Sequence, residues 1–408
     1  MNKKNNQPLD GINVFDLTRV LAGPTCTQTL GDLGANIIKI EKPDSGDDSR
    51  KLGPPYLKST QSEEKESAYY LSVNRNKNSI TIDLTKEEGQ KLAKKLIAKS
   101  DILVENFRAG NLKQYGLDYK EIKKINSKII YCSITGFGQT GPYSKRGGYD
   151  YLVQALGGIM SITGEKKGDP TKIGVGVSDI ITGLYASIAI LSALRYREIS
   201  GKGQHIDISL LDSQVSWLSY VAQGYLISGK IPKRLGNDHP SIVPYQTVKA
   251  KDGLMVIAIA NDNQFKNFCL FTKLNNLFLD KKYQTNSARV KNRNKLNRII
   301  GDVIKTKKIK YWVDGLIKVN VPCGPINDIE KVFKDPQVNF RDMVVSMSHR
   351  LSKNKKINLV GSPINLSESP VKYKKSPPML GEDTNFILKK YLKLKKFEIE
   401  ILKKKKII

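Results

Sequence analysis

Short apolar segments alternate with helical segments through the first third of the chain, and this alternation limits the possible folds more than any other feature. Residues 24–33 and 86–98 have helical periodicity, and Pro24 is well placed in the first turn of the earlier helix. Runs of apolar and β-branched residues predict strands at 12–17, 36–41, 79–84, 101–105 and 129–134. Strands joined through helices need right-handed crossovers, which leave the strands parallel. The sequence therefore predicts an α/β fold on a mostly parallel sheet.

The composition changes after about residue 229. Residues 229–252 are rich in Pro, Gly and Asn, which predicts a linker or an exposed loop. A buried strand at 254–260 follows, and then a basic helical stretch to about residue 319. Residues 388–408 predict a basic helix with a frayed tail whose lysines face solvent. The change of composition marks the candidate domain boundary.

The chain is strongly basic, with a formal net charge of +29 from 68 Lys and Arg against 39 Asp and Glu. The lysines are scattered, and Lys, Asn and Ile are abundant together, as the codon bias of an AT-rich genome would produce. We therefore expect a solvated lysine surface and no nucleic-acid partner. Such a surface would still attract small polyanionic ligands.

Neither a targeting segment nor a metal site is predicted. The start, MNKKNNQPLDG, has no apolar segment after its basic residues, and no run of about 18 apolar residues occurs. The four cysteines and three histidines are spread without ligand spacing, so neither structural zinc nor disulfides are expected. The expectation is a soluble cytoplasmic protein without a membrane span.

A glycine motif at residues 136–141, GFGQTG, matches the dinucleotide fingerprint G-x-G-x-x-G directly after a predicted strand. The fingerprint requires a helix immediately after the strand, because the helix N-terminus binds the pyrophosphate. Here Pro142 and Gly147 interrupt any helix, and residues 150–160 predict a helix where a second strand and its acidic residue should lie. We therefore expect no dinucleotide there, but a loop whose glycines let the backbone pass close to something else.

Asp179 precedes an apolar helix predicted at 180–195 and is a natural N-cap. From the residues alone, a capping role without chemistry remains open. A carboxylate at a helix N-terminus is also expected to stay ionised and oriented, which is what a nucleophile needs.

Several motifs, in order along nearly the whole chain, resemble the class III CoA-transferases, the family of formyl-CoA transferase and carnitine CoA-transferase. They are PLDGINVFDLTRVLAGPTCTQTLGDLGANIIKIEKPDSGDDSR, NRNKNSITIDL, DILVENFRAGNL, YCSITGFGQTGPYSKRGGYDYLVQALGG, GVGVSDIITGLYA, GKGQHIDISLLDS, VPCGPIND and PPMLGEDT. The resemblance implies transfer of CoA from an acyl-CoA to a free carboxylic acid, with Asp179 as the nucleophile. It implies an aspartyl anhydride and an aspartyl-CoA thioester as intermediates, and no metal, redox cofactor or ATP. CoA enters as a substrate.

The same resemblance implies a set of CoA-binding residues. They are Val20, Leu21, Ala22, Lys42, Ile82, Asp83, Asn106, Phe107, Arg108, Arg146, Gly147, Tyr149 and Asp150. Backbone amides of the glycine loop, at Gly136, Gly138 and Gly141, are candidates for stabilising oxyanions. Simple turn glycines remain the alternative.

Departures from formyl-CoA transferase affect the predicted substrate. That enzyme has a glutamine where this chain has Leu21 and a CoA-binding arginine where it has Gln114, and its glycine-rich lid loop is absent here. The stretch GNDHPSIVPYQ is instead similar to members that use succinyl-CoA and dicarboxylic acids such as glutarate, malate or mesaconate. Candidates for a distal carboxylate are Arg234, His239, Tyr245 and Gln246, although His239 can equally be a loop histidine.

The alternative function within the superfamily is that of an α-methylacyl-CoA racemase. Racemisation needs two acid–base groups, one on each side of the α-carbon. That branch has a histidine in the segment that matches GGYDYLVQALGG, and this chain has Tyr149. A phenol with an ordinary pKa of about 10 is a poor substitute at neutral pH.

The resemblance also implies the architecture. We expect a Rossmann-like large domain from 1–225 plus 345–408, a smaller inserted domain at 237–335, and linkers at 226–236 and 336–344. The subunits of this family form an interlocked, ring-like homodimer, which is expected here by analogy.

Overall fold

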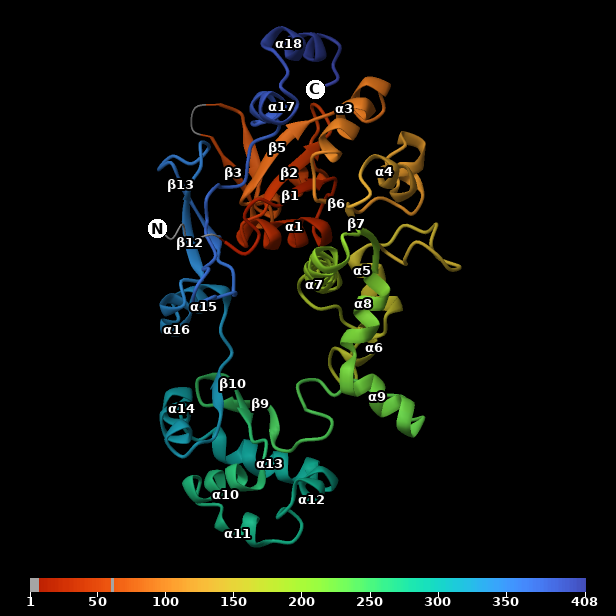
Figure 1. The fold of residues 1–408 in the computed structure, drawn as a ribbon. Helices are drawn as coiled ribbons and strands as arrows, with labels where there is room; N and C mark the ends of the chain where they lie inside the picture. Colours follow the sequence, from red (N-terminus) through yellow and green to blue (C-terminus); the bar gives the residue numbers. More distant parts are fainter. Residues whose placement is uncertain (1–6, 60–61) are drawn as a thin grey trace. The chain divides into compact units, whose positions relative to one another are not determined.

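The computed structural model describes residues 7–59 and 62–408 of the 408-residue chain (Figure 1). The chain divides into two compact units, each described by itself below. Unit 1 comprises the described residues up to Ile159, together with Ile173–Ser228 and Asn339–Ile408; unit 2 comprises Met160–Lys172 and Gly229–Val338. Unit 2 thus starts earlier than residue 237 and takes in a short segment that the sequence analysis placed in the large domain.

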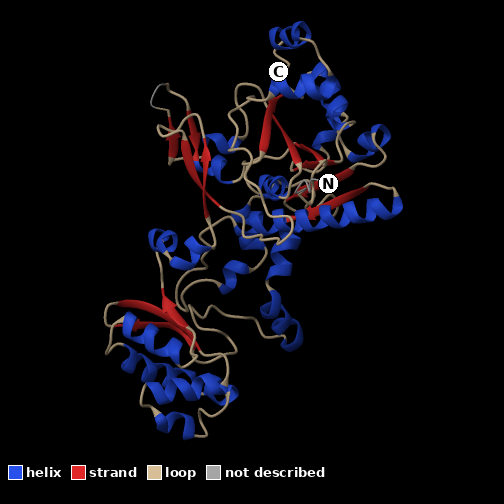
Figure 2. Ribbon diagram, turned by 60° about the vertical axis from the view of Figure 1, so that its left-hand side comes forward, coloured by secondary structure: helices blue, strands red, loops and turns tan. Residues whose placement is uncertain are grey.

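Unit 1 is built on a six-stranded sheet in which every neighbouring pair of strands is parallel (Figure 2). Its strands are β1 Asn13–Asp16, β2 Asn36–Glu41, β5 Lys77–Thr81, β6 Ile102–Glu105, β7 Ile130–Thr135 and β8 Gln204–Ser209. The order across the sheet is β5-β2-β1-β6-β7-β8, the third, second, first, fourth, fifth and sixth of these strands along the chain. This is the order of doubly wound nucleotide-binding sheets. The prediction of a mostly parallel α/β sheet is confirmed.

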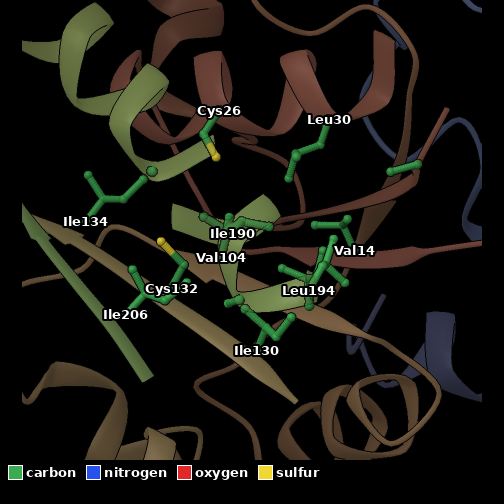
Figure 3. Packing of buried hydrophobic residues seen from close by; sticks show 14 of the residues in the cluster. Val14, Cys26, Leu30, Val104, Ile130, Cys132, Ile134, Ile190, Leu194 and Ile206 are labelled. Atoms are coloured by element: carbon green, nitrogen blue, oxygen red, sulfur yellow. The ribbon is translucent and has the colours of Figure 1, made fainter. Parts of the chain in front are cut away.

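Helices cover both faces of this sheet because neighbouring strand residues point to opposite faces. On one face, Val14 belongs to a buried cluster with Cys26 and Ile190 (Figure 3). On the other face, Phe15 belongs to a cluster with Leu92. The helices of the first face are α1 Ala22–Asp32 and α7 Val177–Ser200; those of the second are α3 Glu87–Ile97, α4 Tyr119–Ile125 and α17 Thr384–Leu392.

Shorter elements complete unit 1. The helices are α2 Ala68–Ser72, α5 Asp150–Leu156, α8 Leu210–Trp217, α9 Ser219–Ser228, α16 Pro336–Phe340 and α18 Lys396–Lys404, with 3-10 turns at Asp48–Lys51 and Asn111–Tyr115. Two antiparallel hairpins pair β3 Tyr56–Lys58 with β4 Lys65–Ser67, and β12 Val344–Ser348 with β13 Lys356–Val360. The end of α16 begins the last segment of unit 1.

Helix α7 has 24 residues and is long and apolar enough to cross a membrane by length and composition alone. Half of its most apolar window is buried inside the structure, and core helices of soluble proteins commonly have this character. Its residues Ala186, Ile190 and Leu194 belong to the buried cluster against the sheet. The absence of a membrane span stays a prediction.

Unit 2 has a three-stranded antiparallel sheet, in the order β11-β10-β9, covered by helices. Its elements are α6 Ile159–Ile162, β9 Tyr245–Ala250, β10 Gly253–Ala258, α10 Asp262–Phe271, α11 Asn275–Leu279, α12 Asn286–Lys291, α13 Arg293–Ile304, α14 Ile309–Lys318, β11 Cys323–Pro325 and α15 Ile329–Lys334. Phe268, Ile300 and Leu316 lie in its own buried cluster. The prediction that 229–252 is only linker or loop is wrong for β9, in which Val248 and Ala250 point inward and Lys249 points outward.

The carboxyl-terminal segment is not one helix with a frayed tail, as the sequence predicted. Lys393 has a left-handed φ of 58°, which ends α17 before α18 begins. Ile407 is only 2% exposed, and its carbonyl accepts a hydrogen bond from the Asp83 amide at 2.7 Å. The many lysines of this segment concealed the alternate apolar residues that anchor it, such as Ile399.

Candidate active site

A pocket of about 190 Å³ opens at the carboxyl end of β1. The order of strands reverses at β1, which lies between β2 and β6, and ligands of doubly wound sheets bind at such a reversal. The pocket is lined by residues that follow β1, β6 and β7 and by the first turn of α7. Eleven residues named in the sequence analysis line it: Val20, Leu21, Ala22, Asn106, Phe107, Arg108, Gly136, Arg146, Gly147, Tyr149 and Asp179.

A second pocket of about 350 Å³ lies beside the first. The two share Arg19, Asp48 and Phe107 in their linings. Of the predicted CoA-binding residues, the second pocket brings together Lys42, Ile82 and Asp83, which follow the ends of β2 and β5. Loops after five neighbouring parallel strands, β5, β2, β1, β6 and β7, therefore line one continuous edge of the sheet.

Asp179 is the third residue of α7, and the residue at the N-cap position is Gly176. The predicted N-cap role of Asp179 is therefore wrong. Asp150, the first residue of α5, supplies the cap instead, because its Oδ1 accepts a hydrogen bond from the Ser178 amide at 2.8 Å. A cap that comes from another helix leaves no signal in the local sequence.

The Asp179 carboxyl group is half-buried at the wall of the first pocket. Burial, and then the negative charge of Asp150, raise its pKa to about 7. Loss of solvent therefore opposes the ionised state that the helix N-terminus favours, and it is the larger effect on this pKa. Among residues 7–59 and 62–408, no side chain or amide forms a hydrogen bond or ion pair with this carboxyl group, so its oxygens are available for chemistry.

Asp150 lies behind the pocket lining instead of in it. Besides Ser178, it accepts a hydrogen bond from Gln154 Nε2 at 2.7 Å. Gln154 is fully buried, and its Oε1 accepts from the Ile173 amide at 2.8 Å. Oδ1 of Asp150 thus joins α5 to the start of α7, which helps to fix the position of Asp179, and Oδ2 is held within α5 by Gln154.

The glycine loop after β7 is a loop with a close backbone approach, as predicted. A Cβ on Gly136 would lie 2.5 Å from the Cα of Gly148, so neither position accepts a side chain without movement. Gly138 has a left-handed φ of 87°. Between the end of β7 at Thr135 and the start of α5 at Asp150, the chain forms no helix. This approach brings the backbone of residues 147–149 to the end of β7, where both segments line the first pocket.

Three arginines line the first pocket. Arg19 forms an ion pair with Asp48 at 3.2 Å and lies 4.9 Å from the centre of the Phe107 ring. Arg146 stacks on the Tyr143 ring at 3.8 Å. Within the part of the chain that the structure describes, neither Arg108 nor Arg146 forms an ion pair, so two cationic groups are free to meet an anionic ligand.

Asn106 uses its side chain within the protein. Its Oδ1 accepts from the Arg19 amide at 2.9 Å, and its Nδ2 donates to the Arg19 carbonyl at 2.7 Å. Gln114 lies in the 3-10 turn Asn111–Tyr115 and lines neither pocket. Leu21 lines the first pocket, and its side chain reaches to Gly176, where an added Cβ would lie 2.8 Å from Leu21 Cδ2.

The candidates for a distal carboxylate lie in unit 2. The guanidinium of Arg234 donates to the Gly168 carbonyl at 2.6 Å and to the Glu165 carbonyl at 3.3 Å. His239 Nδ1 accepts from the Ser241 amide at 3.1 Å, and its ring lies 5.3 Å from that of Tyr245. Gln246 is buried. Arg234 is therefore held by the loop at 165–168, which weakens its candidacy for a substrate carboxylate.

Sequence reasoning missed a buried ionic network under the two pockets. Lys39 and Asp47 form a fully buried ion pair at 2.8 Å, and Lys77 lies 3.4 Å from the equally buried Asp16. The sequence did contain a signal for this network. Lys39 interrupts the apolar strand NIIKIE, and a charged side chain in a buried strand must have a partner of opposite charge. Tyr69 of α2 was also missed; burial, and then the charges of Asp179 and Asp150, raise its pKa to about 12.

The fold and the pocket define a doubly wound α/β protein with arginines and a half-buried carboxyl group at the carboxyl edge of its sheet. The model of CoA-transferase family III matches residues 9–384. A succinate–glutarate CoA-transferase from Agrobacterium fabrum is 45% identical over 92% of this chain and 93% of its own. A succinyl-CoA:mesaconate CoA-transferase from Haloarcula hispanica is 36% identical over 92% of this chain and 94% of its own.

A solved structure agrees with these relatives. The crystal structure of a CAIB/BAIF family protein from Brucella suis is 45% identical, with a TM-score of 0.84 over 95% of this chain and 100% of that one. The chain belongs to CoA-transferase family III. The predicted resemblance and the assignment as a CoA-transferase of this family are confirmed.

Proposed function

We propose that this protein transfers CoA from succinyl-CoA to a dicarboxylic acid of the size of glutarate, malate or mesaconate. The observation that carries the proposal is the Asp179 carboxyl group, which has no partner among the described residues and lies at the wall of a pocket at the strand-order reversal. The similarity to relatives that are named for succinate, glutarate and mesaconate supports the choice of donor and acceptor.

The proposed reaction proceeds through covalent intermediates on Asp179. The ionised carboxylate attacks the thioester carbonyl and expels CoA thiolate, which leaves a mixed anhydride. The thiolate then attacks the Asp179 carbonyl, releases succinate and forms an aspartyl-CoA thioester. The acceptor carboxylate attacks this thioester, and the returning thiolate resolves the second anhydride to the product acyl-CoA. Each step exchanges one activated acyl group for another, so the cycle needs no net proton, metal or ATP.

The surroundings of Asp179 suit this chemistry. Backbone amides near Gly136 and Gly147 border the same pocket and are candidates to stabilise the tetrahedral oxyanions. The second pocket, with Lys42 and Asp83, is the proposed place of the nucleotide end of CoA. Arg108 and Arg146 are the proposed partners of anionic groups near the acyl end, in place of Arg234.

The racemase alternative gains no support from the site. Tyr149 is exposed at the pocket lining, and none of the three histidines lines either pocket in the described part of the chain. Asp48 also lines the first pocket, but its carboxylate is occupied by the ion pair with Arg19 at 3.2 Å, so it is a poor second acid–base group to oppose Asp179.

We also propose that the protein is a homodimer, without nucleic-acid or membrane partners, in the cytoplasm. Helix α9 is apolar on all sides, yet none of its residues is buried. A helix of that kind is normally covered. Large apolar residues are also exposed along α5, α7 and α8: Tyr151, Leu152, Ile188, Ile199, Val215 and Trp217. A second copy of this chain is the proposed cover.

Light scattering tests the homodimer. We expect a particle of twice the 45.6 kDa chain mass. The double variant Leu226→Lys/Ile227→Lys on α9 is expected to be monomeric, because two charges would be buried without partners. Phe397→Lys, at an equally exposed apolar residue on α18, should remain dimeric. A monomeric wild type would contradict the proposal.

An acceptor screen tests the function. The purified protein is mixed with succinyl-CoA and a panel of carboxylic acids, and new acyl-CoA masses are recorded. We expect conversion of dicarboxylic acids with four or five carbons and much slower conversion of monocarboxylic acids of the same length. Conversion of no acid with succinyl-CoA or other acyl-CoA donors, or α-proton exchange without an acceptor, would refute the proposal.

A further inference from the structure

The turn between β1 and α1 holds its shape against an unfavourable backbone conformation. Val20 has a left-handed φ of 69°. A β-branched residue rarely adopts that region, because its Cβ crowds the backbone, and such strain persists only where neighbours enforce it. Val20 lines the first pocket beside Leu21 and Ala22, so the strain lies at the proposed binding surface.

Side chains from other segments bond to the backbone of this turn at Thr18, Arg19 and Val20. The Thr18 carbonyl accepts from Lys39 Nζ at 2.7 Å, and Asn106 brackets both backbone groups of Arg19. The Val20 amide donates to Asp47 Oδ1 at 3.0 Å. This last bond acts on the strained residue itself.

Asp47 is itself rigidly placed. Its Oδ2 accepts from Lys39 Nζ at 2.8 Å, and its Oδ1 also accepts from the Ser49 amide at 2.9 Å and the Ser49 hydroxyl at 2.8 Å. Its own amide donates to Glu41 Oε2 at 2.9 Å, which ties it to the end of β2. Asp47 also lines the second pocket, so one carboxylate connects the two pockets.

We propose that Asp47 is a positioning residue of the transfer site: it holds Val20 in the left-handed conformation and thereby shapes the acyl-CoA surface of residues 20–22. This inference rests on the proposed function. Both carboxylate oxygens of Asp47 accept hydrogen bonds, and asparagine has only one acceptor oxygen, so it cannot serve both Lys39 Nζ and the Val20 amide. Once the bond to its amide is lost, Val20 is expected to relax to a negative φ and carry Leu21 and Ala22 out of place.

Asp47→Asn tests the proposal against Asp32→Asn. Asp32 is an equally buried carboxylate in an ion pair with Arg75, and it lines neither pocket. Misplacement of a binding surface by about 1 Å can cost roughly 100-fold, and we expect kcat/KM of Asp47→Asn to fall by about that factor. Asp32→Asn loses stability in the same way but should keep kcat/KM.

A second substitution separates positioning from stability. Glycine adopts positive φ about as readily as negative φ, so Val20→Gly in the Asp47→Asn background should recover roughly tenfold in kcat/KM. The effect of Val20→Gly alone is measured to complete the double-mutant cycle. If Asp47→Asn lowered activity only by destabilising the fold, Val20→Gly would not restore kcat/KM.

Outcomes for the two proposals are distinguishable. CoA affinity, measured by calorimetry on the same variants, reports on the turn even if the wild type transfers CoA to no acid. A wild type that transfers CoA, with Asp47→Asn no worse than Asp32→Asn or with no recovery by Val20→Gly, would overturn the positioning role and leave the function intact. Should Asp47→Asn not fold, Asp47→Glu keeps the charge beside Lys39 but displaces the oxygens, and the same loss and recovery are expected.

Discussion

Replacement of Asp179 by alanine is expected to lower the rate of CoA transfer by roughly 10⁴-fold or more, which is the scale of loss when a covalent nucleophile is removed. The carboxyl group lines the pocket and is free of hydrogen bonds within the described residues, so its loss removes the attacking atom and leaves the surrounding packing nearly unchanged. Succinyl-CoA with the acceptor from the screen provides the measurement.

Asp212→Asn is the matched control for this variant. Asp212 occupies the same third position in α8 that Asp179 occupies in α7, but its side chain is exposed and lines neither pocket. We expect it to retain activity, which would exclude a general helix-dipole effect as the cause of the loss. Full activity of Asp179→Ala would rule out the covalent mechanism.

Isotope transfer tests the anhydride directly. When the acceptor carries ¹⁸O in its carboxylate, one labelled oxygen bridges to the Asp179 carbonyl in the second anhydride. Attack of CoA thiolate on the acyl carbonyl then leaves that oxygen on Asp179. The peptide that contains Asp179 should gain the mass of one ¹⁸O after turnover, and Asp179→Ala should gain none.

The acid limb of the pH profile is the second large effect that we expect. Only ionised Asp179 can attack, and its pKa is raised to about 7. Below that pH, kcat/KM should fall about tenfold per unit, or roughly 100-fold at pH 5 relative to the plateau. A plateau that extends unchanged to pH 5 would contradict this prediction.

Asp150→Asn tests whether the fall of kcat/KM at acid pH comes from protonation of Asp179. Removal of the neighbouring negative charge favours ionised Asp179, so the limb should move to lower pH, while the amide oxygen can still accept from the Ser178 amide. Glu105→Gln is the control, because burial first raises the pKa of Glu105 to about 7 as well, at the end of β6. If the limb moved only in Glu105→Gln, Asp179 would not be the titrating group.

The same raised pKa has a consequence for folding. The folded state holds the Asp179 proton up to a higher pH than the unfolded state, whose ordinary pKa is 3.8. Stability is therefore lost as the pH rises through this interval, because ionisation opposes burial. Asp179→Asn is expected to melt at a higher temperature than the wild type at pH 8.

Sequence reasoning predicted the parallel sheet because its strands β1, β2, β6 and β7 are apolar on both faces and stand out as continuous runs. It missed β8 and β9, in which alternate residues are polar, and it placed β5 two residues too late. These strands are recognisable only through the neighbour with which they pair.

The candidate site also has a part that the sequence predicts and a part that it does not. Asp179 and the loops after the strands follow from the resemblance and from the rule that ligands bind at the carboxyl ends of a doubly wound sheet. The capping of α7 by Asp150 and the strain at Val20 depend on contacts between segments far apart in sequence, and no local pattern records them.

The order in which the chain is synthesised separates its two units. All of unit 2, including 229–338, leaves the ribosome before the last segment of unit 1, which starts at Asn339. Unit 2 has its own buried cluster and can complete its fold first, as inserted domains generally do. The hydrogen bond from the Asp83 amide to the Ile407 carbonyl closes beside the second pocket only when nearly the whole chain is free. A nascent chain therefore carries Asp179 and all the residues that line the two pockets, which lie within 17–210, long before the segment that bonds to the Asp83 amide is synthesised.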